Sequence, residues 1–207
     1  MSSAIDQLTE SFARFPGIGP RQAKRFVYHL LQQDPAVLAN LSQQILKLRK
    51  EINRCGRCYR FFSPTENYQE QCDFCRDTSR DAAQLMVVAR DTDLDAMHKS
   101  HAYDGYYFVL GGLLSLTERH PDPSLRGVQL LARVQADVAA GSLKEIILAL
   151  SANTEGDHTA EYVESLVSPL TESGQLKLSH LGRGLSTGTE LEYSDSATIK
   201  SALKNRS

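Results

Sequence analysis

The chain has 207 residues, of which 41% are hydrophobic and 23% charged, and its formal net charge is −2. This balance is ordinary for a globular protein and is enough chain to bury a core. No stretch reaches the roughly 18 uncharged apolar residues that a membrane helix requires. The segment from Met1 to Phe15 lacks the basic start and apolar run of a secretory signal. We therefore expect a cytoplasmic protein without membrane contact.

Charge is distributed unevenly along the chain. Residues 1–60 contain 10 Lys and Arg against 4 Asp and Glu, a net of +6, so the remainder carries −8. A basic front on an acidic body favours a polyanion bound by the front, and a chance imbalance of solvated faces is the alternative.

The first quarter of the chain predicts three helices. Residues 3–14 place apolar side chains one turn apart, and the segment Phe15–Pro20 then interrupts with two glycines and two prolines. Pro20 suits the first turn of a second helix, where its missing N–H costs nothing. A third helix is predicted from Pro35 to Ile52. Its apolar stripe has the 3-4-3-4 spacing of a helix-packing seam, made by Leu38, Leu41, Ile45, Leu48 and Ile52.

From Gln84 onward, short apolar runs alternate with helical patterns. The predicted strands are Leu85–Ala89, Tyr106–Leu110, Ile146–Leu150 and Leu176–Leu178. The predicted helices are Asp93–Lys99, Leu125–Ala139 and Asp157–Leu170. Strands that alternate with helices predict an α/β fold with a mainly parallel sheet. The tail after Leu191 fits neither pattern.

All four cysteines lie within 21 residues of a polar, irregular segment, as two Cys-x2-Cys pairs with a 13-residue spacer: Cys55, Cys58, Cys72 and Cys75. Two such pairs can complete a tetrahedral shell of four sulfurs, which suits one structural zinc ion per chain with no open coordination position. Two disulfides, which a cytosolic location disfavours, and an iron–sulfur cluster are the alternatives. Four arginines flank the cysteines and could offset thiolate charge or face a phosphate backbone: Arg54, Arg57, Arg60 and Arg76.

The turn between the first two helices predicts a DNA contact. Gly17 and Gly19 let the backbone turn sharply and approach another surface, and the free N–H groups there can hold a phosphate. Arg21, Lys24 and Arg25 lie opposite the apolar stripe of the following helix. This arrangement favours a helix-hairpin-helix motif that contacts phosphates without reading sequence. An ordinary helical hairpin with a solvated basic side is the alternative.

These features, in this order, resemble the RecR family of bacterial recombination mediators. The resemblance begins with the hairpin turn and the four cysteines. It continues through Tyr107–Gly112, the motif Glu155-Gly156-x2-Thr159-x2-Tyr162, and the segment from Arg183 to Asp195. It implies a helix-hairpin-helix DNA-binding region at 1–53, a four-cysteine zinc knuckle at 54–80, and a Toprim-like α/β domain at 81–207 that ends in a Walker-B-like segment.

The resemblance also implies a function. Members form ring-shaped homo-oligomers, dimeric or tetrameric, that encircle DNA in the bacterial cytoplasm, associated with the nucleoid. They work with RecO and RecF to load RecA onto single-stranded DNA. We therefore expect a non-catalytic DNA-binding protein of recombinational repair.

Several positions depart from the family pattern. Ala89 stands where catalytic Toprim domains carry a metal-binding glutamate, and the loop 113–121 lacks the family's pattern of prolines and glycines. Ser186 and Thr189 stand where a proline and a glycine are common, and the cysteine spacer is longer than usual. No Walker A pattern occurs. Ala89 and the absent Walker A pattern favour a protein that is not an enzyme, and the other departures indicate a divergent member of the family.

Two acidic residues follow the third predicted strand in the sequence. Glu155 and Asp157 are expected to form an acidic surface for a protein partner. Together with Asp91 or Asp93, they could instead hold magnesium. A Toprim-type nuclease or primase-like enzyme is therefore one alternative function, and a zinc-stapled scaffold that binds only proteins is another.

Overall fold

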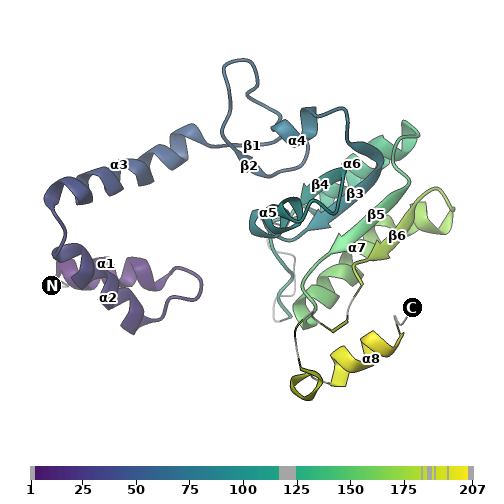
Figure 1. Ribbon diagram of the computed structural model, residues 1–207. Coiled ribbons are helices and arrows are strands. Elements are labelled where there is room, and N and C mark those ends of the chain that lie inside the picture. Colours follow the sequence, from purple (N-terminus) through teal and green to yellow (C-terminus); the bar gives the residue numbers. More distant parts are fainter. Residues whose placement is uncertain are drawn as a thin grey trace. The chain divides into compact units, whose positions relative to one another are not determined.

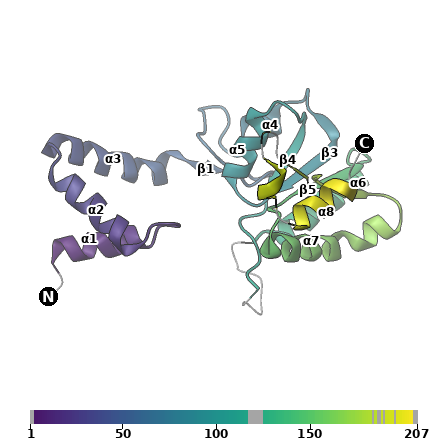
Figure 2. The ribbon, with the colours of Figure 1, turned by 60° about the horizontal axis from the view of Figure 1, so that its bottom comes forward.

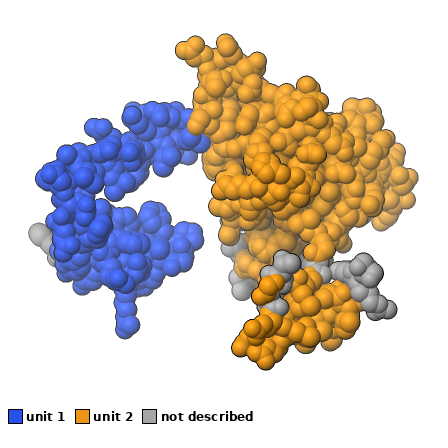
Figure 3. Space-filling model, in the orientation of Figure 1, with its two compact units in different colours: residues 1–52 blue, residues 53–207 orange. Residues whose placement is uncertain are grey.

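A computed structural model of the chain divides into two compact units, residues 1–52 and residues 53–207 (Figure 3). The described residues are 3–116, 125–182, 184–185, 188, 190–194 and 196–204. Residues 117–121 of the loop 113–121 lie outside this set, as do Ser186 and Thr189.

Unit 1 contains three helices, α1 (Ala4–Ala13), α2 (Pro20–Leu31) and α3 (Pro35–Glu51) (Figure 1). Each begins at a residue whose local chemistry favours a helix start. Ser3 and Asp6 form a capping box, Pro20 occupies the first turn of α2, and the Asp34 side chain accepts a hydrogen bond of 2.7 Å from the Ala36 N–H. The first and third predicted helices are confirmed to within one residue at each end, and the second begins at Pro20 as predicted.

Unit 1 buries little of its apolar surface. Ala23 and Val27 are its only buried residues among positions 3–52. α1 and α2 pack through an edge-on contact of Phe12 and Phe26, whose ring centroids are 6.0 Å apart. The three helices leave an apolar groove of about 370 Å³. Residues of the predicted seam line it, namely Leu38, Leu41 and Ile45.

Unit 2 is built on a four-stranded parallel sheet in the order β4-β3-β5-β6. Its strands are β3 (Asp81–Val88), β4 (Gly105–Val109), β5 (Glu145–Ala149) and β6 (Lys177–His180). The connecting helices are α5 (Asp91–Lys99), α6 (Gly127–Ala139) and α7 (Thr154–Glu172). The predicted parallel α/β sheet is confirmed.

Alternate side chains of β3 pack into two separate hydrophobic cores. Leu85 and Val87 belong to the cluster that α6 and α7 complete. Met86 and Val88 belong to the cluster that α5 and the cysteine segment complete. Successive side chains of a strand point to opposite faces, so one strand supports both layers. The connection from β3 to β4 runs in the direction opposite to the one from β4 to β5, so α5 and α6 cover opposite faces.

The cysteine segment carries three short elements, β1 (Asn53–Arg54), antiparallel to β2 (Phe61–Phe62), and α4 (Asp73–Arg76). It is fastened to the sheet by backbone and side-chain bonds. The Val109 N–H donates to the Cys58 carbonyl oxygen at 2.8 Å, and Arg133 donates to the carbonyl oxygens of Arg57 and Tyr107. The segment is therefore part of unit 2's fold.

The tail that fitted neither sequence pattern contains a 3₁₀ turn (Leu191–Tyr193) and helix α8 (Ser196–Lys204). α8 lies beside α7 (Figure 2), and residues of both line a pocket of about 410 Å³. Within the described part of the chain, no helix has the length and apolar character needed to cross a bilayer.

The two-core arrangement predicts unequal effects of one substitution at two positions of α6. Val134 is fully buried, whereas Val128 is 75% exposed. Val134→Ala should lower the free energy of unfolding by about 2 kcal/mol, because it removes two buried carbons and leaves a cavity. Val128→Ala should change it by less than about 0.5 kcal/mol. Urea denaturation of both variants measures this, and equal losses would contradict the assignment of the buried face.

Candidate metal centre and nucleic-acid interface

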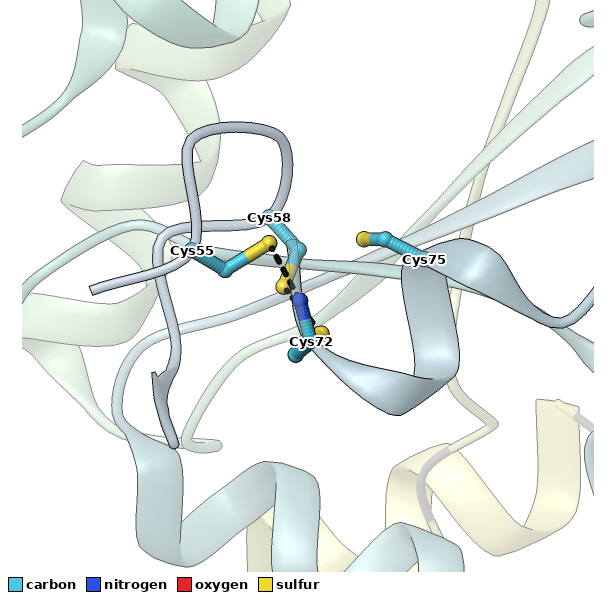
Figure 4. Close-up of side chains that lie close together, drawn as sticks. All are labelled: Cys55, Cys58, Cys72 and Cys75. Carbon is cyan, nitrogen blue, oxygen red and sulfur yellow. Dashed lines mark hydrogen bonds between the residues drawn. The ribbon is translucent and has the colours of Figure 1, made fainter. Parts of the chain in front are cut away.

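The four cysteines converge in the cysteine segment. Cys55 and Cys58 lie on the loop after β1, and Cys72 and Cys75 lie at the start of α4 and within it (Figure 4). All four side chains are buried, none forms a disulfide, and their sulfurs lie within 4.8 Å of one another. A tetrahedral ion with metal–sulfur bonds of about 2.3 Å would place its sulfurs about 3.8 Å apart. The cluster can therefore hold one metal ion.

Backbone bonds fix the loop that carries the first cysteine pair. The Cys55 N–H donates to the Arg60 carbonyl oxygen at 2.9 Å, and the Gly56 N–H donates to the Glu70 carbonyl oxygen at 2.8 Å. The second bond ties the first cysteine pair to the segment that precedes the second. A further backbone N–H, that of Cys72, points at the Cys55 sulfur at 3.4 Å.

The crowding of four sulfurs perturbs their ionisation. Hydrogen bonds from the thiols of Cys58, Cys72 and Cys75 lower the pKa of Cys55. Hydrogen bonds with Cys55, Cys72 and Cys75 raise the pKa of Cys58. Four thiolates without a cation would repel one another, whereas a bound divalent metal lets all four ionise.

The arginines around the cysteines stack on aromatic rings. Their guanidinium carbons lie 3.7–5.0 Å from ring centroids in four pairs, Arg54 with Phe61, Arg57 with Tyr106, Arg60 with Phe74, and Arg76 with Tyr68. Arg57 and Arg60 also form ion pairs with Asp137 and Asp73, at 3.5 Å and 3.0 Å. The positive charges of Arg57 and Arg60 are therefore partly neutralised by these carboxylates.

The hairpin turn of unit 1 has the backbone that its glycines predict. Gly17 has a φ of +75°, a left-handed conformation that a side chain would strain. Gly19 caps α2 without a side-chain hydrogen bond. The first turn of α2 contains no acidic residue, so its N-terminal dipole faces solvent with no carboxylate from that turn.

Three cations lie on the open side of α2. Arg21, Lys24 and Arg25 are exposed, while Ala23 and Val27 on the opposite side are buried. Arg25 contacts Gln22 at 3.4 Å, and within the described residues no carboxylate comes within ion-pair distance of the three cations. The turn and these side chains together present positive charge on one surface of unit 1.

The sheet of unit 2 has a topological switch point at the carboxyl ends of β3 and β5. The connections after these adjacent strands leave in opposite directions, and ligands of open α/β sheets bind at such a point. Ala89, which follows β3, is buried and offers no metal ligand. Glu155 and Asp157 are exposed in the first turn of α7, after β5. Between them, Gly156 packs so closely that a β-carbon there would collide with the Ser151 carbonyl oxygen.

Asp91 and Asp93, the two aspartates considered for a magnesium site, accept backbone hydrogen bonds. The Asp91 carboxylate accepts the Phe61 N–H at 2.8 Å, which links α5 to the cysteine segment. The Asp93 carboxylate accepts the Arg90 N–H at 2.9 Å and caps α5. Both carboxylates therefore have structural bonds.

Two buried arginines were not anticipated from the sequence. Arg126 donates to the Val109 carbonyl oxygen at 2.7 Å, at the carboxyl end of β4, and burial lowers the pKa of its guanidinium. Arg133 lies on the apolar side of α6 between Leu130 and Val134. A charged residue on an apolar stripe is the one sequence feature that could have indicated Arg133.

Comparisons with known proteins agree with this geometry along the whole chain. A family model of the RecR helix-hairpin-helix matches residues 5–48, a Toprim model matches 83–181, and a model of the RecR C-terminal region matches 184–207. The chain is 34% identical to Recombination protein RecR of Streptomyces coelicolor, over 98% of this chain and 95% of that protein. It is 36% identical to the protein of the same name from a Synechococcus strain, over 98% and 94%.

The relative from Gloeobacter violaceus, also named Recombination protein RecR, is 34% identical over 98% of this chain and 96% of its own length. The hairpin, the four-cysteine cluster and the Toprim sheet therefore occur together in a chain that matches these relatives almost from end to end. The chain belongs to the RecR family.

Proposed function

We propose that the protein is a non-catalytic recombination mediator that binds DNA through its hairpin. In this proposal it helps load RecA onto single-stranded DNA in the cytoplasm, together with RecO and RecF. The unpaired cations of α2 beside the Gly17–Gly19 turn carry the proposal, within a chain of the RecR family. Residues 1–53, 54–80 and 81–207 are its proposed DNA-binding, zinc-binding and Toprim parts.

The metal in this proposal is zinc. A closed shell of four thiolates leaves no position for a substrate, so the ion would stabilise the knuckle and supply no chemistry. The aromatic and aliphatic side chains packed around the sulfurs, among them Phe62, Phe74 and Tyr107, support a structural role.

Purified protein should contain one zinc per chain, and Cys72→Ser should lose it together with thermal stability, because metal binding and folding of the knuckle are coupled. Ser63→Ala, an exposed change in the same segment, is the matched control and should retain both. Elemental analysis and thermal melts measure this. Disulfides in place of metal, or bound iron, would contradict the assignment.

The DNA contact is tested by removing charge from α2. Lys24→Ala/Arg25→Ala should weaken duplex binding similarly on every sequence. The slope of log affinity against log salt concentration should become shallower by up to about 2, because each lost phosphate contact removes about 0.9 from that slope. Lys99→Ala/Lys144→Ala removes the same charge from exposed positions of unit 2 and should leave binding unchanged. Fluorescence anisotropy over a salt series measures both. Unchanged affinity and slope in the first variant would exclude the hairpin as the contact.

The acidic turn of α7 is proposed as a protein-binding surface, because Glu155 and Asp157 are exposed and lack the strand-end acid that a magnesium site needs. The alternative of a Toprim nuclease predicts magnesium-dependent nicking that Glu155→Ala abolishes. The alternative of a scaffold for proteins alone predicts no DNA binding at any salt concentration.

The small core of unit 1 supports the proposal of a homo-oligomer. Only two side chains are buried among the described residues 3–52 of unit 1, so the unit gains little from its own packing. A second copy that covers the groove would supply the missing burial. Ile45 lines the groove and is 58% exposed, whereas the adjacent Leu46 is 68% exposed and does not line it.

Ile45→Asp should therefore shift the protein to a smaller assembly, because it places an unpaired charge in the covered groove. Leu46→Asp, the same change one residue along α3, should leave the assembly intact. Light scattering at high micromolar concentration measures the mass. Wild-type protein that is monomeric there, or two variants that behave alike, would count against assembly through the groove.

A further inference from the structure

The knuckle carries an open hollow of about 320 Å³ on the side of β2 and α4. Arg60, Tyr68, Asp73 and Arg76 are among the residues that line it. The Arg76 guanidinium lies 3.7 Å from the centre of the Tyr68 ring, while 48% of Tyr68 remains exposed. One face of the ring is thus covered by a cation, and ring surface remains open to a ligand.

Arg76 differs from the other arginines of the hollow and its surroundings. Arg60 is paired with Asp73 at 3.0 Å, and Arg80 with Asp77 at 3.5 Å. Among the described residues, no carboxylate lies within ion-pair distance of Arg76, and its Nε is buried without a hydrogen-bond partner. A guanidinium that stacks on a ring and keeps its charge unpaired is suited to a phosphate.

The backbone holds this pair in place. Thr65 and Tyr68 exchange backbone hydrogen bonds of 3.2 Å and 3.0 Å across a tight turn, and the Gln69 side chain closes the turn by donating to the Thr65 carbonyl oxygen. Arg76 follows Cys75 in α4. Tyr68 precedes the second cysteine pair and Arg76 follows it, so formation of the four-cysteine cluster limits the movement of both residues and lowers the entropy cost of binding.

We propose that Tyr68 and Arg76 form a contact for single-stranded DNA, in which a base stacks on the tyrosine ring and its phosphate pairs with the guanidinium. Bases of a duplex already stack on one another, whereas an unpaired strand offers free faces to an aromatic side chain. The inference rests on the proposed DNA-binding function and adds a second site, in unit 2, to the hairpin.

The charges around the hollow predict how this contact differs from the hairpin. Glu66 and Glu70 are exposed on the same segment, so the knuckle does not attract DNA through a strong positive field. Binding depends on stacking and on one phosphate, which contributes only about 0.7 to the salt slope of a single strand.

The test compares an oligothymidylate with an abasic strand of the same length, in variants of the full-length protein. Wild-type protein should bind the oligothymidylate more tightly. Tyr68→Ala should reduce that affinity fivefold or more, the size of one lost stacked base, and leave the abasic strand and duplex DNA unaffected. Tyr68→Phe keeps the ring and should bind like wild type. Arg76→Gln should weaken both single strands, whereas Lys144→Gln, which removes an exposed charge elsewhere in unit 2, should weaken neither.

Zinc content is measured for each variant. If Arg76→Gln loses its metal, the comparison of Tyr68→Ala with Tyr68→Phe still tests whether a base stacks on the tyrosine ring. The inference is overturned if Tyr68→Ala binds like wild type, if Tyr68→Phe is as weak as Tyr68→Ala, or if Tyr68→Ala weakens binding of the oligothymidylate and of the abasic strand equally. Duplex binding that persists and depends on Lys24 and Arg25 would then leave the proposed function standing without this site. Absence of all DNA binding would instead contradict the proposed function itself.

Discussion

The convergence of four buried sulfurs within 4.8 Å is the constraint on which one face of unit 2 depends. Phe62 and Phe74 pack beside the sulfurs, and Met86, Val88 and Tyr107 of the sheet complete the same cluster. The four-sulfur site is thus part of a core layer. A metal ion there would stabilise the knuckle and also the sheet face it covers, because four buried thiolates need a compensating cation. The stacked arginines are positioned by this same layer.

At the carboxyl edge of the sheet, the residue that follows β3 carries no carboxylate. Ala89 removes the strand-end ligand, and Asp91 and Asp93 accept backbone hydrogen bonds that organise α5 and the knuckle. Arg126 places a buried positive charge at the end of β4, which opposes the binding of a cation near it.

The sequence predicted features that depend on neighbouring residues and missed those that depend on distant ones. Pro20 marks its helix start by local chemistry, and the cysteine spacing alone predicts the cluster. β3 begins four residues before its predicted start, because Asp81–Gln84 belongs to the strand through backbone pairing and has no apolar run. Arg133 is buried because its acceptors lie far away along the chain, on Arg57 and Tyr107. The spacing of the apolar residues of α3 indicates that this face of the helix packs against another surface. No local pattern identifies that surface.

Hydrogen–deuterium exchange of the full-length protein, with and without duplex DNA, tests most directly whether this family member binds DNA at the hairpin and not at the sheet edge. We expect slower exchange at residues 17–25, where phosphates would contact the turn and the start of α2, and unchanged exchange in the first turn of α7. Protection of Glu155–Asp157 together with the end of β3, and none at the hairpin, would contradict it. That result would assign the DNA to the Toprim crevice.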